Sequence, residues 1–151
     1  CTAPLFADPV STAKAVKLEP VLGKLHTLKP NRIEAELLSG VKITDDATLH
    51  QAAQALLDQG VQRVFLSLGG DGVFAAQQGE THLEPICKAE MRNATGAGDA
   101  MMASLVWSFL AGRNLAESCA AGTAAAAIAV ESEETINPNM SAEAVLARAA
   151  K

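Results

Sequence analysis

The residues best suited to chemistry in this chain lie together in the segment Thr95-Gly96-Ala97-Gly98-Asp99. Two glycines separated by one alanine let the backbone turn sharply and approach an anion, and the apolar run 101–110 that follows has the periodicity of a helix. A helix N-terminus carries free N–H groups and about half a positive charge, so it binds phosphate without lysine or arginine. Asp99 is then placed to accept a proton.

Other interpretations of this segment can be tested against the residue types that each motif requires. Aspartate is also common in the first turn of any helix, and glycine-rich turns are widespread. A Walker loop needs lysine and then serine or threonine after its last glycine, whereas Asp99 and Ala100 follow here. A dinucleotide fingerprint needs a small residue where Met101 stands, which weakens the alternative of a dinucleotide oxidoreductase domain. The pattern therefore favours a phosphate-binding loop that is followed directly by a general base, Asp99.

A second pair of candidate residues is Asn31 and Glu34, which follow Pro30. Asparagine followed three residues later by glutamate is typical of a helix N-cap with a reciprocal capping acid. A helix that opens at the carboxyl end of a strand is also where open α/β sheets place ligands, so the same glutamate can face a hydrated cation. Both interpretations can hold together.

A third candidate segment is Ser67-Leu68-Gly69-Gly70-Asp71-Gly72, which follows the β-prone run 61–66. Turn chemistry alone predicts a tight hairpin turn over Gly70-Asp71-Gly72. A glycine loop directly after a strand can also pass close to a bound phosphate. The residues themselves leave both interpretations open.

The elements that must position these residues follow from the periodicity and the caps along the chain. We expect an α/β fold whose mostly parallel sheet carries helices on both faces, because strands and helices alternate. The expected strands are 5–7, 25–28, 61–68, 73–77 and 82–86. The expected helices are 11–18, from Asn31 to Gly40, from Asp45 or Asp46 to Gly60, from Asp99 to Gly112, 115–130 and 141–148.

Composition restricts the class of protein. The chain has 151 residues, 49% of them hydrophobic, and a net charge of −5, so it can bury one core and lacks the basic surface that nucleic acid or anionic lipid would attract. Cys1, Cys87 and Cys119 are odd in number and far apart, and the histidines are isolated, so neither zinc nor a disulfide framework is indicated. The apolar stretches are shorter than the roughly 20 residues that cross a bilayer. A cytoplasmic enzyme domain with reduced thiols is expected.

The segment 93–99 closely resembles the Asp-Thr-x-Gly-Ala-Gly-Asp signature of the ribokinase-like (pfkB) sugar and nucleoside kinases. The resemblance implies that the amides of Gly96, Ala97 and Gly98 form an anion hole for the transferred phosphate. It implies that Asp99 deprotonates the substrate hydroxyl. Such a hole stabilises the spread negative charge of phosphoryl transfer without reorganising.

The same resemblance assigns the other candidates to ATP and Mg²⁺. Asn31 and Glu34 match the family's Asn-x-x-Glu motif, which organises magnesium and the nucleotide phosphates, with Glu34 acting through water. The further nucleotide contacts that it implies are Ser67, Gly69, Gly72 and Thr95.

One position departs from the family signature. Asn93 stands where aspartate is usual, and in many relatives that aspartate and the threonine matching Thr95 help bind a monovalent cation. Losing the carboxylate weakens the attraction for a cation, although the backbone carbonyls of Asn93 and Thr95 could still coordinate one. The sequence therefore leaves a K⁺ requirement open.

Within the family, residues 28–36 and 92–105 resemble the bacterial pseudouridine kinases. This implies transfer of the ATP γ-phosphate to the 5′-hydroxyl of pseudouridine, with ribose, fructose and adenosine as alternative acceptors. The chain begins inside what looks like a strand and matches the C-terminal, nucleotide-binding half of such kinases over residues 1–151, so the N-terminal half and its lid are expected to be missing. A fragment that binds nucleotide without activity is a second alternative, and a homodimer is compatible with the resemblance.

Overall fold

The computed structural model describes residues 2–151, so Cys1 lies outside the described residues. The chain divides into two compact units, which are described separately below. The first unit runs to Gly69 and includes Phe74–His82, and the second comprises Gly70–Val73 and Leu83–Lys151. The chain has the α/β fold that the sequence predicts.

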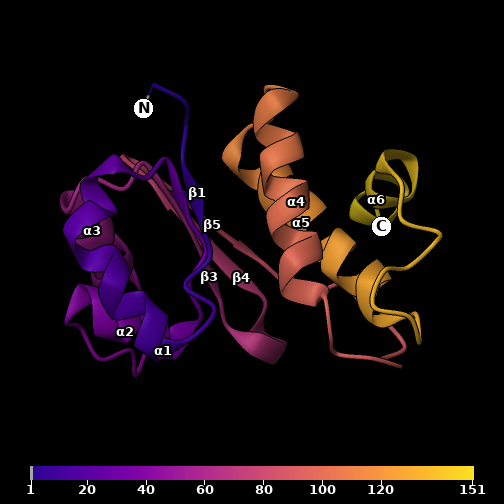
Figure 1. Ribbon diagram of the computed structural model, residues 1–151, viewed down its shortest axis with the longest axis horizontal. Helices are drawn as coiled ribbons and strands as arrows, with labels where there is room; N and C mark the ends of the chain where they lie inside the picture. The colour runs from indigo at the N-terminus through magenta and orange to yellow at the C-terminus, as the bar shows by residue number, and fades with distance from the viewer. Residues whose placement is uncertain (1) are drawn as a thin grey trace. The chain divides into compact units, whose positions relative to one another are not determined.

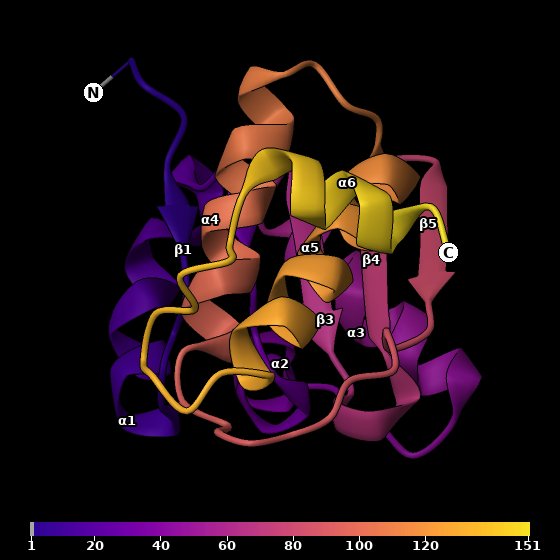
Figure 2. The same ribbon diagram turned by 90° about the vertical axis from the view of Figure 1, so that its right-hand side faces the viewer.

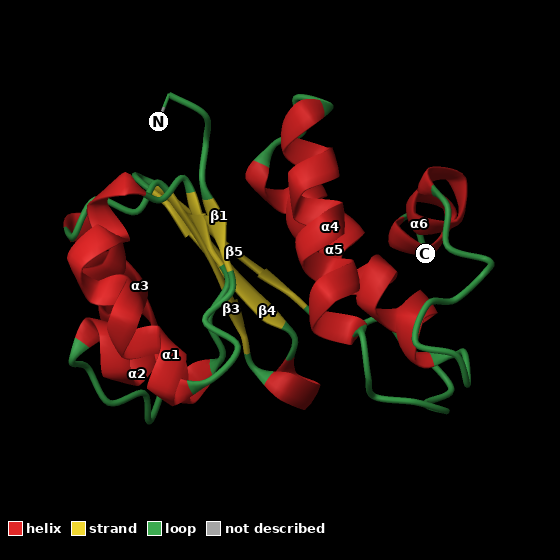
Figure 3. Ribbon diagram, in the orientation of Figure 1, coloured by secondary structure: helices red, strands yellow, loops and turns green. Residues whose placement is uncertain are grey.

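The sheet has five strands in the order in which they occur along the chain. Its strands are drawn in yellow in Figure 3. The first three are parallel, because Phe6 pairs with Thr27 and Leu28 pairs with Val64. The last two are joined by only two residues, Gln78 and Gly79, a connection that is possible only between antiparallel neighbours. The sheet is therefore mixed. Its strands are β1 (Phe6–Ala7), β2 (Thr27–Leu28), β3 (Arg63–Ser67), β4 (Val73–Gln77) and β5 (Glu80–Glu84).

The helices of the first unit lie together on one face of this sheet (Figure 1). Buried side chains of β3, including Val64 and Leu66, share one core with α3 residues such as Leu56. The left-handed Gly40 ends α2, as predicted. The elements are α1 (Thr12–Ala15), the 3-10 segment η1 (Val16–Lys24), α2 (Arg32–Ser39) and α3 (Asp46–Asp58).

Several elements differ from the sequence prediction: β2 and β3 are shorter than the predicted 25–28 and 61–68, and three further differences have local causes. The helix expected over 11–18 is α-helical only to Ala15 and continues as a 3-10 segment, which accommodates Pro20. Strand β5 lies at Glu80–Glu84 instead of 82–86, because the two-residue turn after β4 sets where it begins. The segment Gly69–Asp71 is one 3-10 turn, η2, instead of a tight hairpin turn over Gly70-Asp71-Gly72.

The second unit is helical apart from its share of the strands. Helix α4 (Ala97–Leu110) packs along α5 (Leu115–Val130), and α6 (Ala142–Ala149) packs on α5 (Figure 2). Small residues of α5 allow this close packing, since Ala121, Ala124 and Ala125 form a buried cluster with Val145 of α6. Helix α5 has the predicted bounds. Helix α4 begins two residues before Asp99, so that aspartate lies inside its first turn.

Both cysteines of residues 2–151 are free thiols. Burial raises the pKa of Cys119 to about 12, so its thiol stays protonated, and Sγ lies 3.7 Å from the Val73 carbonyl oxygen as a weak donor. Within the same residues, no helix combines the length and the apolar character needed to cross a membrane.

Two glycines of the first unit give a matched test of packing. Gly60 has φ +103°, and a Cβ there would lie 2.7 Å from the Gly23 Cα, whereas Gly40 has φ +71° with open space around it. We expect Gly40→Ala to lower the free energy of unfolding by roughly 1 kcal/mol through backbone strain alone. Gly60→Ala adds a backbone overlap and should cost roughly 2 kcal/mol or more. Urea denaturation followed by circular dichroism measures both, and equal losses would contradict the packing argument.

Candidate active site

The candidate residues of the first unit lie at the carboxyl ends of β2 and β3. Asn31 is the N-cap of α2: its Oδ1 accepts a hydrogen bond from the Glu34 N–H at 2.9 Å, and Glu34 Oε2 accepts one from the Asn31 N–H at 3.0 Å. This reciprocal pair is the capping box that the sequence predicts. Glu34 is 2% exposed, so its carboxylate is held where the helix begins.

The residues around Glu34 are compatible with Mg²⁺ held mainly by phosphates and water. Among residues 2–151, no three histidine, cysteine, aspartate or glutamate side chains are grouped to form a metal cage. Mg²⁺ usually keeps several waters and takes one or two carboxylates together with substrate phosphates, so a cage is not required. The capping box uses one oxygen of Glu34, and Oε1 retains lone pairs for a water.

The structure brings Ser67 beside Asn31. The Ser67 N–H donates to the Pro30 carbonyl oxygen at 2.9 Å, and the two chain segments form a parallel bridge between Asn31 and Ser67. Gly69 follows with φ +62°, and a Cβ there would have no neighbouring atom within 4 Å, so its backbone conformation, not a lack of space, favours glycine. Asn31, Glu34 and Ser67 are therefore adjacent in this unit, and Gly69 follows two residues after Ser67.

An ion pair that the sequence analysis did not identify lies at the same edge. Lys29 Nζ is 2.7 Å from Asp8 Oδ2, and the Lys29 side chain is 8% exposed. Asp8 Oδ1 also accepts the Val10 N–H at 3.0 Å, where Val10 adopts φ +65°, an uncommon conformation for a β-branched residue. A signal was present, since Asp8 and Lys29 each follow a strand and precede a proline.

The candidate residues of the second unit surround the start of α4. Gly96 is the N-cap with φ +88°, and a Cβ there would lie 2.8 Å from the Thr135 carbonyl oxygen. Both the left-handed backbone and the lack of space for a side chain therefore favour glycine at this position. No side chain caps this helix. The N–H groups of Ala97, Gly98 and Asp99 have no partner within the described chain and are available to an anion.

This open N-terminus distinguishes α4 from the other helices. Of the α-helices formed by residues 2–151, α4 is the one without a side-chain cap. The others are capped by Ser11, Asn31, Asp45, Asn114 and Ser141. The sequence prediction that residues 96–98 present free amides is therefore compatible with the observed backbone.

Asp99 is the third residue of α4 and is exposed. Its carboxylate makes no hydrogen bond or ion pair within residues 2–151. Glu34 folds back to cap helix α2, whereas Asp99 does not cap helix α4. Both oxygens can accordingly accept a proton or a hydrogen bond from a ligand.

The remaining candidates of the second unit have structural roles. Gly72 has φ +101°, and a Cβ there would overlap the Glu84 carbonyl oxygen, which explains the glycine without a ligand. Asn93 Oδ1 accepts the Thr95 N–H at 2.9 Å, while its Nδ2 donates to the Glu133 carbonyl oxygen at 3.3 Å. The nucleotide contacts predicted for Gly72 and Thr95 stay predictions.

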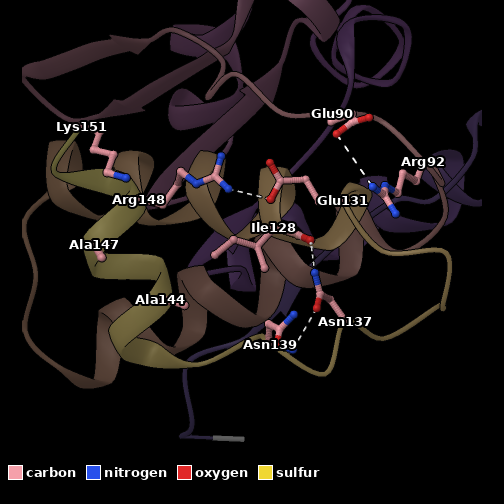
Figure 4. Close-up of a pocket in the computed structure, with 10 residues that line it drawn as sticks. All are labelled: Glu90, Arg92, Ile128, Glu131, Asn137, Asn139, Ala144, Ala147, Arg148 and Lys151. Atoms are coloured by element: carbon pink, nitrogen blue, oxygen red, sulfur yellow. Dashed lines mark hydrogen bonds and ion pairs between the residues drawn. The ribbon is translucent and has the colours of Figure 1, made fainter.

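A polar pocket of about 540 Å³, which the sequence analysis did not predict, lies in the second unit near Arg92 (Figure 4). Its wall contains the ion pair between Arg148 and Glu131, whose closest atoms are 2.6 Å apart, and a longer pair between Arg92 and Glu90 at 3.9 Å. Most of its charged groups therefore neutralise one another.

Comparison with known proteins identifies a family. The model of the pfkB family of carbohydrate kinases matches residues 2–142. Pseudouridine kinase of Escherichia coli K12 is 41% identical over 139 residues, which cover 91% of this chain and 44% of that protein. An uncharacterized sugar kinase of the same bacterium is 40% identical over 144 residues, or 95% of this chain and 40% of that protein.

The fold agrees with this match. A crystal structure of a candidate sugar kinase from Clostridium perfringens superposes with a TM-score of 0.92 at 33% identity, covering 97% of this chain and 46% of that one. The chain thus spans less than half the length of these three proteins.

The Asp8–Lys29 ion pair gives a test of what stabilises the edge of the sheet where Asn31 and Ser67 lie. We expect Asp8→Asn to lower the free energy of unfolding by roughly 2 kcal/mol or more, because it leaves a buried ammonium without its counter-charge. Adding Lys29→Met should recover part of the loss, since the unpaired charge is then gone. Asp58→Asn, at an exposed aspartate bonded to Gln54, is the control, and an equal effect there in urea denaturation would contradict the interpretation.

Proposed function

Because the chain belongs to the pfkB family of carbohydrate kinases, we propose that it is the nucleotide-binding, C-terminal half of an ATP-dependent kinase. The proposed reaction phosphorylates a sugar or nucleoside hydroxyl, with the 5′-hydroxyl of pseudouridine as the preferred acceptor. One observation carries the proposal: an unpaired carboxylate, Asp99, lies in the first turn of the uncapped helix α4. ATP is the phosphate donor expected for the family.

In the proposed reaction, the acceptor oxygen bonds to the γ-phosphorus of ATP while the bond from that phosphorus to the ADP oxygen breaks. Asp99 accepts the proton that the hydroxyl loses. The amides of Gly96, Ala97 and Gly98, with that of Asp99 and the helix dipole, stabilise the negative charge on the transferring group. Mg²⁺ would neutralise phosphate charge, with Glu34 holding one of its waters and Asn31 fixing the start of α2.

The acceptor is the finer part of the proposal. Support for pseudouridine comes from the relative of that name at 41% identity and from the local resemblance around residues 28–36 and 92–105. A sugar kinase without a stated substrate matches nearly as well, at 40% identity, so ribose, fructose and adenosine remain alternative acceptors. A nucleotide-binding piece without activity of its own is the second candidate function, because the chain covers 44% of the pseudouridine kinase. The cytoplasm predicted from the sequence is the expected compartment.

We expect Asp99→Asn to lower kcat by roughly a hundredfold or more, since the amide cannot take the proton. The variant is made in a protein of full kinase length that contains this chain, and ADP release is measured with pseudouridine, uridine, ribose and fructose in turn. Asp58→Asn is the matched control and should keep normal turnover. Near-normal turnover of Asp99→Asn would remove the base assignment, and activity with another acceptor alone would replace the substrate.

Glu34 and Glu117 permit a second matched test, because each closes a capping box at the third position of its helix. Either glutamate changed to glutamine loses the same charge near a helix start but keeps an acceptor oxygen. We expect Glu34→Gln alone to raise the Mg²⁺ concentration needed for half-maximal ADP release. If the two variants give the same Mg²⁺ titration as the parent, Glu34 has only its capping role.

A further inference from the structure

Two segments of the second unit that are 40 residues apart in sequence meet at Asn93. The Val130 carbonyl oxygen accepts the N–H groups of Arg92 at 2.8 Å and Asn93 at 3.1 Å. The Glu133 carbonyl oxygen accepts the Asn93 side-chain amide at 3.3 Å. Carbonyl groups of the loop 130–135 therefore already have N–H donors from the segment that precedes α4.

The orientation of the Asn93 amide follows from its two partners. Its Oδ1 accepts the Thr95 N–H at 2.9 Å, so the NH₂ group points to the Glu133 carbonyl oxygen. The flipped amide would place NH₂ against the Thr95 N–H and oxygen against the carbonyl oxygen, which loses both bonds. Asn93 needs one acceptor and one donor here, and aspartate supplies only the acceptor.

The loop that carries Glu133 is fixed on either side. Glu131 pairs with Arg148 at 2.6 Å, and the buried Asn137 donates to the Ile128 carbonyl oxygen at 2.6 Å (Figure 4). The Asn137 oxygen also accepts the Asn139 N–H at 2.9 Å. Because both flanks are tied to helices α5 and α6, the Glu133 carbonyl cannot easily turn away from position 93.

These contacts do not fit the monovalent cation that the family resemblance implies at this position. A cation needs lone pairs of several oxygens directed at it, preferably with a carboxylate among them. Around Asn93, the loop oxygens already face N–H groups: the side-chain amide faces the Glu133 carbonyl oxygen, and two backbone N–H groups use the Val130 oxygen. The partly positive amide hydrogens repel a cation.

We propose that the Asn93 amide replaces the cation, linking the loop 130–135 to the segment before α4, so that this chain does not require K⁺. Asn93 is thereby a positioning residue. The Asn93 Oδ1 accepts a hydrogen bond from the Thr95 N–H. Thr95 directly precedes Gly96, the left-handed N-cap of α4. The consequence for phosphoryl transfer rests on the proposed function, whereas the amide link and its effect on stability do not.

The test is the melting temperature of this chain in KCl and in tetramethylammonium chloride at equal ionic strength. The wild-type chain should melt at the same temperature in both salts. Asn93→Asp places a carboxylate oxygen against the Glu133 carbonyl oxygen, so it should melt roughly 4 °C or more below wild type in tetramethylammonium. KCl should restore much of that loss, because a cation between the two oxygens removes the repulsion.

Two variants serve as controls. Asn114→Asp makes the same substitution at a cap where only the acceptor oxygen is used, and it should show no preference between the salts. Asn93→Ala removes both bonds without adding charge and should be destabilised equally in both salts.

Three results would overturn the proposal: a wild-type melting temperature that rises in KCl alone, recovery of Asn93→Ala by KCl, or an Asn93→Asp variant that KCl does not stabilise. None of these measurements depends on kinase activity. A failure of the cation argument is therefore distinguishable from a failure of the proposed reaction.

Discussion

The close approach of Gly96 to the Thr135 carbonyl oxygen is the contact on which the proposed chemistry of the second unit depends. A side chain at position 96 would lie 2.8 Å from that oxygen, and the backbone there is left-handed. The residue that lies against the loop 130–135 must therefore be glycine, and α4 begins at the next residue. No residue is left whose side chain could cap the helix. The free amides and the position of Asp99 in the first turn are thus consequences of one backbone constraint.

The α-helices of the described residues begin in two ways, with a side-chain cap or without one. In α2 the Asn31–Glu34 box satisfies two N–H groups, so that helix is stable without a ligand while its carboxylate stays at the sheet edge. Helix α5 begins with the same box at Asn114 and has no candidate residue beside it. A capping motif alone therefore does not indicate a binding site. The absence of a cap at α4, together with an unpaired aspartate, is the more informative combination.

Features that depend on neighbouring residues could be predicted from the sequence, whereas contacts between distant segments could not. The cap at Asn31 and the end of α2 at Gly40 follow from local patterns, and the structure confirms them. The sequence predicts the first helix too long: it is α-helical only to Ala15, and the 3-10 segment that follows contains Pro20, which has no N–H for an α-helical bond. The Asn93–Glu133 bond joins residues 40 positions apart whose types are ordinary for exposed loops, so composition gives no signal of the pairing. The sequence could show that Asn93 lacks a carboxylate, but only the structure shows what its amide does instead.

An amide at position 93 changes the electrostatics at the start of α4. A bound cation would add a full positive charge near the phosphate group of the proposed reaction, whereas the Asn93 amide adds only a dipole that already bonds the Glu133 carbonyl oxygen. In the proposed reaction, stabilisation of the transferring phosphoryl group would then depend more strongly on the amides of α4 and on a magnesium ion bound to the nucleotide. The uncapped helix start and the neutral Asn93 are therefore mutually consistent. The first supplies the positive potential that the second does not.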